Sequence, residues 1–319
     1  MFDFIQTTID GTVDGAIYAL IGLGISLSYS SLRRLNLAYG ATAMLAAYCG
    51  AWMASKFTLN LVTIALIIVT AAGFIGIYVE RLCFARAVEA SDRLENASAT
   101  LASGMDQRDL VALASSFAIW MQLEQLAVNL LPRHMNAFPA LELKQIVHLP
   151  WIGQALSIRL DRLVVAAFSI LLITLIHRWI TLSRSGLAWR TLAEQRLASH
   201  LMGIAVDRLQ TVSFIFASAL SGLTAFLDLS IEGQVTAMFG MWILLKGLTA
   251  AMLGGLGSIM GVVYGGLMLG LTESWAQLAF GAIGREFAVY ALLFLALILQ
   301  SHLARRHKHH HRIRQALSR

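Results

Sequence analysis

Long apolar runs separated by polar connections dominate this chain. A transmembrane helix needs about 20 consecutive, predominantly apolar residues, and the sequence contains nine candidate runs of roughly this length. Two neighbouring runs meet at Gly257 and Ser258, so they form either two spans or one broken or re-entrant pair. The pattern predicts an all-α, polytopic membrane protein of eight or nine transmembrane helices. The candidate spans are residues 11–31, 36–55, 58–80, 110–131, 161–182, 209–228, 240–257, 259–281 and 286–302.

The composition agrees with this prediction. Of the 319 residues, 58% are hydrophobic and 13% are charged, whereas a soluble domain carries about 25% charged residues. Cys49 and Cys83 lie in or beside apolar runs, where cysteine usually packs as a small apolar residue. We therefore predict no metal site. The net charge of +6 comes from scattered arginines, unlike the clustered basic surface of a nucleic-acid-binding domain.

The distribution of lysine and arginine predicts the orientation. If the polar segment 183–208 is cytoplasmic, seventeen basic residues share its side and five lie on the other. Positive charge concentrates in cytoplasmic connections, so we expect the N-terminus outside and the C-terminus in the cytoplasm, in a bacterial inner membrane. The acidic N-terminus lacks the basic start of a cleavable signal, and the first run is expected to be retained.

One transmembrane domain is expected over residues 1–304, followed by a basic cytoplasmic tail at 305–319. The tail's histidines suit metal binding, but its composition favours a solvated segment near anionic lipid. The connection 82–109 is expected to be a cytoplasmic insert. The connection 132–160, which holds all three prolines, is expected to be an ordered external loop.

No catalytic motif is present in the sequence. The glycine-rich stretch 254–258 lacks the lysine of a phosphate-binding loop, and no serine–histidine–acid set or paired-carboxylate site is apparent. We predict that the chain is not an enzyme. Any uphill transport would draw its energy from a partner protein or an ion gradient.

Two charged residues lie deepest in apolar surroundings, Lys246 and Glu273. A charge at the centre of a membrane helix costs about 2.5–3.5 kcal/mol and usually faces the bundle interior. An ion pair between their helices and a contact with substrate are both open. Asp228 and Glu232 are read as solvated carboxylates near an external end.

The segment 36–40 places Asn36, Tyr39 and Gly40 at the start of a span. A broken-helix start with exposed N–H groups would suit a carboxylate ligand, whereas a helix cap and an interfacial tyrosine explain the same residues. With Lys246, Glu273 and the glycines of the 254–258 stretch, these residues are the candidates for a substrate pathway. The three glycines are Gly254, Gly255 and Gly257.

The segment 183–208 predicts a short amphipathic cytoplasmic helix that ends at Gly203. Such a helix between two spans suits docking to a soluble motor, although a helix lying on the membrane surface remains an alternative. The candidate ATPase-coupling residues in this segment are Arg190, Ala193, Ala198, Gly203 and Asp207.

Several stretches resemble the permease subunits of ABC importers for branched-chain amino acids, with which the urea permeases belong. Residues 35–40 are similar to the family's (I/L)NFAHG signature, and the 250–259 stretch, AAMLGGLGSI, matches its glycine-rich signature closely. The likeness covers about residues 11–300. Further matching stretches are residues 15–24, 80–82 and 186–208.

The resemblance implies about eight membrane helices, a second homologous permease subunit, two cytoplasmic ATPases and a periplasmic binding protein. It implies no cofactor in this chain, since ATP and magnesium would bind the partner ATPases. The expected function is import of branched-chain or related amino acids. The alternatives are a urea or short-amide permease of the same kind, or an ATP-independent secondary transporter or channel.

Some positions depart from the family pattern. Tyr39 stands where histidine is usual, and Met260 stands where a proline commonly follows the Gly-Ser-Ile of residues 257–259. In the coupling motif Glu-Ala-Ala-x-x-x-Gly, only Ala198 and Gly203 match, while Leu197 replaces the acidic residue. The departures bear on substrate identity more than on architecture, and they favour docking of an ATPase by shape over a charged contact.

Overall fold

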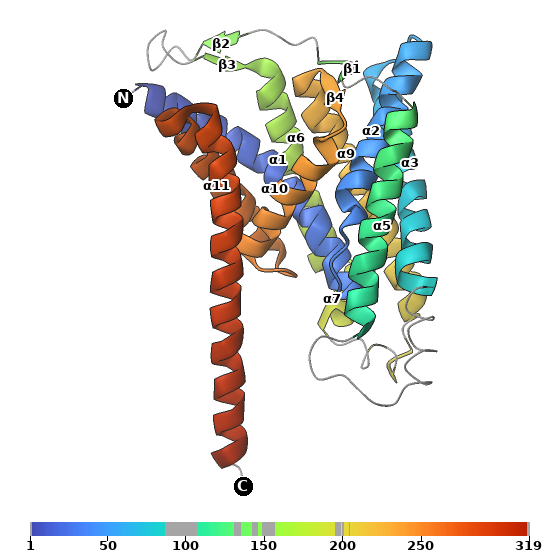
Figure 1. The fold of residues 1–319 in the computed structure, drawn as a ribbon, viewed down its shortest axis with the longest axis vertical. Coiled ribbons are helices and arrows are strands. Elements are labelled where there is room, and N and C mark those ends of the chain that lie inside the picture. Colours follow the sequence, from blue (N-terminus) through green and yellow to red (C-terminus); the bar gives the residue numbers. More distant parts are fainter. Residues whose placement is uncertain are drawn as a thin grey trace.

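A computed structural model shows that the chain is a helical bundle (Figure 1), as the apolar pattern predicts. Each of the nine candidate runs coincides with a helix, and the last two are the two parts of one long helix. The structure describes residues 2–86, 107–130, 135–141, 146–148, 157–194, 199, 201–203 and 205–317.

The helices differ in the length of the connections between them, and the longest described gap separates α5 from α6. Residues 80–86 continue α3 as a π-helical segment, η1, and most of the predicted insert 82–109 lies outside the described residues. The tail 305–319 continues α11 as a helix as far as Leu317. The helices are α1 (Phe2–Leu32), α2 (Ala38–Lys56), α3 (Leu61–Val79), η1 (Glu80–Arg86), α5 (Gln107–Leu130), α6 (Leu160–Leu182), α7 (Arg184–Glu194), α9 (Val206–Glu232), α10 (Phe239–Gly254) and α11 (Ile259–Leu317).

Six helices in the described part are long and apolar enough to cross a membrane: α1, α3, α5, α6, α9 and α11. The 16-residue α10 is apolar but shorter. The alanine-rich α2 is buried along most of its length, which explains why it needs no strongly apolar surface. The outward faces of α3, α6 and α11 carry exposed large hydrophobic side chains, as lipid-facing surfaces do.

The helix α1 lies at the centre of the bundle. Nearly all of its apolar segment is buried, whereas most of that of α11 is exposed. The most extensive helix contact joins α1 to α11, and glycines make it possible. A Cβ on Gly11 would stand 2.9 Å from the carbonyl oxygen of Gly270, so only a residue without a side chain lets the two backbones come this close. A close helix contact at small residues is therefore present within the chain.

The last two helices reverse direction twice, once between α10 (Phe239–Gly254) and α11 and once within α11. Helix α10 ends at a turn, residues 255–258, where the N–H of Gly257 donates to Ser26 Oγ in the C-terminal part of α1 at 3.1 Å. The chain returns along the first part of α11 and reverses at Gly281, whose φ of 73° and ψ of −161° are not helical. The second part then extends past the bundle to the C-terminus (Figure 1). The pair 240–257 and 259–281 is thus a hairpin with contact along its length.

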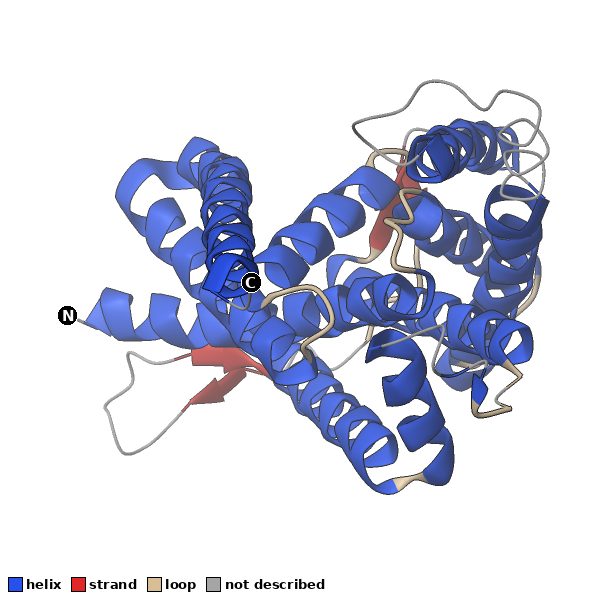
Figure 2. Ribbon diagram, turned by 90° about the horizontal axis from the view of Figure 1, so that it is seen from below, coloured by secondary structure: helices blue, strands red, loops and turns tan. Residues whose placement is uncertain are grey.

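Two short antiparallel sheets lie apart from each other at the end of the bundle where the chain begins (Figures 1 and 2). One pairs β1 (Met135–Ala137) with β4 (Gln234–Thr236), and the other pairs β2 (Ile146–His148) with β3 (Ser157–Arg159). The described parts of the predicted external loop 132–160 therefore include strands. Helix α7 and the C-terminus lie at the opposite end (Figure 1).

Candidate functional site

Four side chains from three helices form an ionic cluster inside the bundle: Tyr18, Lys246, Glu273 and Arg285. Nζ of Lys246 lies 3.2 Å from Oε1 of Glu273, and Nε of Arg285 donates to the same oxygen at 2.6 Å. The Tyr18 hydroxyl accepts from Lys246 at 2.8 Å and from Arg285 at 3.2 Å. Two cations therefore share one carboxylate oxygen and one phenol.

The reversal at Gly281 places Arg285 next to Glu273. The two residues are 12 positions apart in the same long helix α11, and a straight helix would separate them by about 18 Å. The backbone conformation of Gly281 lies in a region that essentially only glycine adopts. The sequence thus places a glycine where the chain must fold back for the ion pair to form.

Asp14 extends the cluster on α1. It precedes Tyr18 by four residues, so both side chains project from the same face of the helix. Its Oδ2 lies 3.9 Å from Arg285. Buried ion pairs cost desolvation energy that only good geometry offsets. A dense cluster of them inside an apolar bundle therefore suggests a functional role in addition to a structural one.

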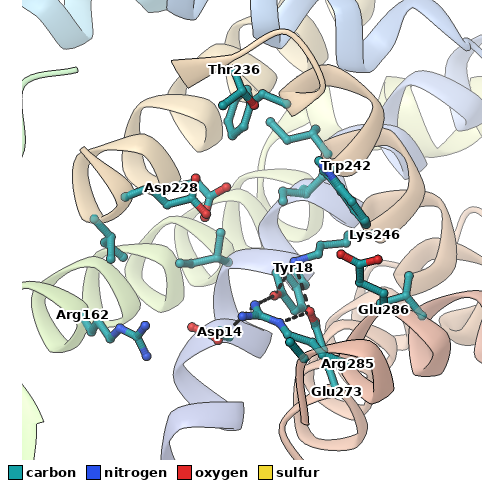
Figure 3. Close-up of a pocket in the computed structure, with 18 residues that line it drawn as sticks. Asp14, Tyr18, Arg162, Asp228, Thr236, Trp242, Lys246, Glu273, Arg285 and Glu286 are labelled. Atoms are coloured by element: carbon teal, nitrogen blue, oxygen red, sulfur yellow. Dashed lines mark hydrogen bonds and ion pairs between the residues drawn. The ribbon is translucent and has the colours of Figure 1, made fainter. Parts of the chain in front are cut away.

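A cavity of about 440 Å³ opens beside the ionic cluster (Figure 3). This volume falls in the range of about 300–1,000 Å³ that is typical of small-molecule sites. The lining mixes charged side chains with aliphatic and aromatic ones. The charged lining residues are Asp14, Arg162, Asp228, Glu232, Lys246, Glu273, Arg285 and Glu286. The apolar lining residues are Ile17, Ile21, Ile231, Phe239, Trp242, Ile243, Ala282 and Val289.

Two polar atoms of the lining are buried without a hydrogen-bond partner in the described structure. Oε2 of Glu273 is an acceptor and Nε of Arg162 is a donor. Glu273 is only 3% exposed, so the free oxygen cannot be satisfied by bulk water. Figure 3 shows the Arg162 guanidinium pointing towards Asp14, with the Asp228 carboxylate on a separate helix. The hydrogen-bonding capacity of these two lining residues is therefore not fully used within the described structure.

The predicted pathway residues divide between the cavity and the helix packing. Lys246 and Glu273 line the cavity and form the ion pair that the sequence suggested. Asn36, Tyr39 and Gly40 lie outside it. The Asn36 side chain accepts from the N–H of Ala38 at 3.0 Å, as a helix cap does, and Tyr39 is buried against α1. Gly40 packs directly on the backbone of α10 at Gly240.

The glycine-rich stretch also lies outside the cavity. Gly254 packs against the backbone of Gly261 and so closes the α10–α11 hairpin. Gly255 and Gly257 form the turn with φ values of 87° and 99°. The geometry gives these three glycines a part in the hairpin rather than in the cavity wall.

The predicted coupling residues lie at the opposite end of the bundle, on and after α7. The guanidinium of Arg33, just past α1, donates to the carbonyl of Ala193 at the end of α7. Arg190 donates to the carbonyl of Thr181 at 3.2 Å. Gly203 has a φ of 76° and is exposed with nothing packed on its α-carbon, and Asp207 lies exposed in the first turn of α9. Ala198 lies outside the described residues.

Helix α7 is amphipathic, but it ends at Glu194 and not at Gly203 as the sequence predicts. Trp189 and Leu192 are buried against the bundle, while Leu187 on the other side is exposed. Within the part of the chain that the structure describes, no group of three His, Cys, Asp or Glu side chains is arranged to hold a metal ion.

Several charged cavity residues were not identified from the sequence. The pattern does not single out Arg162, Arg285 or Glu286, and it predicts solvated carboxylates at Asp228 and Glu232. Asp228 in fact lies a full turn inside α9, which continues to Glu232, and it lines the cavity. The sequence signal for Asp14 is its position four residues before Tyr18 in an apolar helix, which places both polar side chains on one face.

A family model described as "Branched-chain amino acid transport system / permease component" matches residues 7–300. The chain belongs to this family. The resemblance seen in the sequence motifs is thereby confirmed, and this permease is a transport component rather than a catalytic one.

Curated relatives match along nearly the whole permease. The high-affinity branched-chain amino acid transport system permease protein LivH of Escherichia coli is 26% identical over 296 residues, which cover 93% of each chain. The corresponding protein BraD of Pseudomonas aeruginosa is 25% identical over 308 residues, covering 94% of this chain and 95% of the relative. Among solved structures, PsaBC from Streptococcus pneumoniae in complex with Fab is 12% identical with a TM-score of 0.45, covering 92% and 90% of the two chains.

Proposed function

We propose that this permease is the membrane-spanning subunit of an ATP-driven importer for branched-chain or related amino acids. The observation that carries the proposal is the family match over residues 7–300. The named functions of LivH and BraD, which align along the whole chain, support the same substrate class. A cavity lined by both charged and aliphatic side chains is chemically suited to such molecules.

In this proposal, ATP and magnesium bind two separate cytoplasmic ATPases, and the chain itself holds no cofactor. A second, homologous permease subunit completes the membrane part, and a periplasmic binding protein delivers the substrate. The exposed face of α7 and the following segment up to Gly203 and Asp207 would meet an ATPase. The hydrogen bond from the Arg33 guanidinium to the Ala193 carbonyl holds α7 to the end of α1, which supports a transmitting role.

The proposed orientation has the N-terminus outside and the C-terminus in the cytoplasm of a bacterial inner membrane. Two observations support it. The arginine-rich segment 183–208 predicts a cytoplasmic side, and α7 lies at the same end of the bundle as the C-terminus, opposite the N-terminus (Figure 1).

Two alternatives are less well supported. Urea or a short amide is neutral and small, so it gives no reason for a cavity with eight charged side chains. A secondary transporter or channel gives no reason for an amphipathic helix whose exposed face lies at the end of the bundle.

Uptake of radiolabelled leucine, measured in a bacterial strain that lacks its own leucine and urea systems and expresses the chain with its cognate partners, tests the substrate class. We expect unlabelled isoleucine and valine to compete and urea to have no effect. Competition by urea, with leucine not taken up, would overturn the proposed substrate.

The coupling role has its own test at Gly203. A tryptophan there would project from an exposed turn and block a close-fitting partner, whereas asparagine tolerates the same positive φ without bulk. Gly203→Trp is expected to abolish co-purification of the ATPase and uptake, and Gly203→Asn is expected to keep both. Unchanged co-purification and uptake in Gly203→Trp would contradict docking at this segment.

A further inference from the structure

The cavity beside the ionic cluster carries charges that the fold itself does not use. Lys246 and Arg285 are both occupied by Glu273 Oε1 and the Tyr18 hydroxyl. Arg162, by contrast, has a buried Nε without a hydrogen-bond partner among the described residues. Arg162 lines the cavity, and none of its guanidinium N–H groups forms a hydrogen bond or ion pair with another described residue, so a ligand's carboxylate is a fitting partner for it.

The acidic side of the cavity is similarly incomplete. The Asp228 side chain on α9 lines the cavity, and no hydrogen bond or ion pair joins its carboxylate to another residue in the described ranges. Oε2 of Glu273 is buried and also lacks a donor. Five carboxylates and three basic groups line the cavity. The excess of carboxylates favours a ligand that carries a positive group.

The rest of the lining is apolar and includes several branched residues. Ile17 and Ile21 come from α1, Ile243 from α10 and Val289 from α11. A ligand that satisfies the whole cavity therefore needs a negative group, a positive group and an aliphatic body. A free α-amino acid with an apolar side chain has all three on one small molecule, whereas urea has none of them.

We propose that this cavity is a binding site for an apolar amino acid as a zwitterion, with its carboxylate on Arg162, its ammonium group on Asp228, and its side chain against Ile17, Ile21 and Ile243. The proposal rests on the proposed function and deepens it, because it assigns substrate-recognising residues to the permease itself. Glu273 acts as a positioning residue here, since its pairing with Lys246 and Arg285 keeps those two cations away from the ligand's carboxylate.

The test uses a cysteine reporter in the cavity lining. Ala282→Cys is introduced into the full chain after Cys49 and Cys83 are replaced by alanine, and membrane vesicles that carry it are treated with a small, membrane-impermeant thiol reagent. Leucine is expected to slow labelling in a saturable way. Leucinamide, which lacks the carboxylate, and 4-methylpentanoate, which lacks the ammonium group, are each expected to need at least about 10-fold higher concentrations, and urea is expected to give no protection.

Two variants connect the protection to the named residues. Arg162→Gln and Asp228→Asn are each expected to raise the half-protecting leucine concentration at least about 10-fold, and Arg162→Lys is expected to restore part of the loss. The matched control is Arg178→Gln, an exposed arginine on the same helix as Arg162, which is expected to leave protection unchanged. If Arg162→Gln fails to reach the membrane, Asp228→Asn and the ligand analogues still decide the question.

The outcomes separate this inference from the proposed function. Leucine uptake without any protection of the reporter would overturn the cavity site and leave the importer function standing. Equal half-protecting concentrations in Arg162→Gln and Arg178→Gln would also overturn it, since the charged wall would then be purely structural. Protection by leucine together with uptake of urea alone would support the site and overturn the proposed transport substrate.

Discussion

Glu273 and Arg285 lie on opposite sides of a chain reversal and meet with 2.6 Å between Oε1 and Nε. The pair joins the two parts of α11, and through Lys246 and Tyr18 it also ties α11 to α10 and α1. The N-terminal helix α1 is thus joined to α10 and to both parts of α11 by one group of charged side chains.

Removal of either member of this pair is expected to be costly. Glu273→Gln leaves two cations facing each other and is expected to lower the free energy of unfolding by about 3–5 kcal/mol. Arg285→Gln leaves Lys246 to neutralise the carboxylate, so its expected effect is smaller. The double variant is expected to show a coupling energy of about 1–3 kcal/mol in thermal unfolding of the detergent-solubilised permease. Strictly additive effects would contradict a direct interaction.

The reversal depends on the backbone of Gly281. In Gly281→Ala the new methyl group meets no atom within 4 Å, so any loss comes from the backbone conformation alone, and we expect about 1–3 kcal/mol of destabilisation. Gly73→Ala in α3 is the matched control, because its Cβ would make an ordinary contact at 3.8 Å with Ile215 and the residue is helical. That control is expected to be neutral or stabilising by up to about 1 kcal/mol. Equal unfolding temperatures for the two variants would show that the reversal is not strained.

The α1–α11 contact is expected to tolerate no side chain at Gly270. A Cβ there would stand 2.5 Å from the α-carbon of Gly15, a backbone atom that cannot move without separating the helices. We expect Gly270→Ala to destabilise the permease by about 1–3 kcal/mol and to reduce its yield in the membrane. The same measurement on Gly73→Ala provides the comparison, and a yield and unfolding temperature equal to those of the unsubstituted chain would contradict the packing.

The link between α1 and α7 is expected to matter for coupling more than for folding. Arg33→Gln loses the charged contact with the carbonyl of Ala193, so we expect leucine uptake per ATP hydrolysed to fall by at least about 3-fold while the amount of permease in the membrane stays the same. Arg184→Gln, an exposed arginine at the start of α7, is the control with no expected change. A fall of the same size in both variants would argue for a general charge effect.

Much of the fold follows from the sequence, because membrane helices are read from apolar length and glycine spacing. Each apolar run coincides with a helix. The glycine pairs Gly11/Gly15 and Gly266/Gly270, each at a spacing of four positions, mark close helix contacts in the sequence, and the structure shows that they meet each other within the chain. The pairing of Lys246 with Glu273 also follows, since two opposite charges deep in apolar helices gain most by meeting.

The rest of the cavity depends on geometry that periodicity does not contain. Arg285 reaches Glu273 only because the chain reverses at Gly281, and a single glycine in an apolar run does not reveal a reversal. Asp228 lies inside the bundle because α9 continues for another turn, and the ends of helices are the least predictable part of a pattern. The 36–40 segment predicts a ligand site and a helix cap equally well, because both use an asparagine at the start of a helix. The structure shows the cap, since the N–H of Ala38 donates to the Asn36 side chain.

Helix α1 contributes Asp14 and Tyr18 to the cavity, and the chain just past its other end contributes Arg33 to α7. Its 31 residues form a rod of about 46 Å. If α1 moves as one piece during transport, a displacement at the cavity is also a displacement at the α7 end. A molecule that then binds more tightly to one position of α1 would change the affinity of a partner at α7 by the same factor as the partner changes the affinity of the cavity.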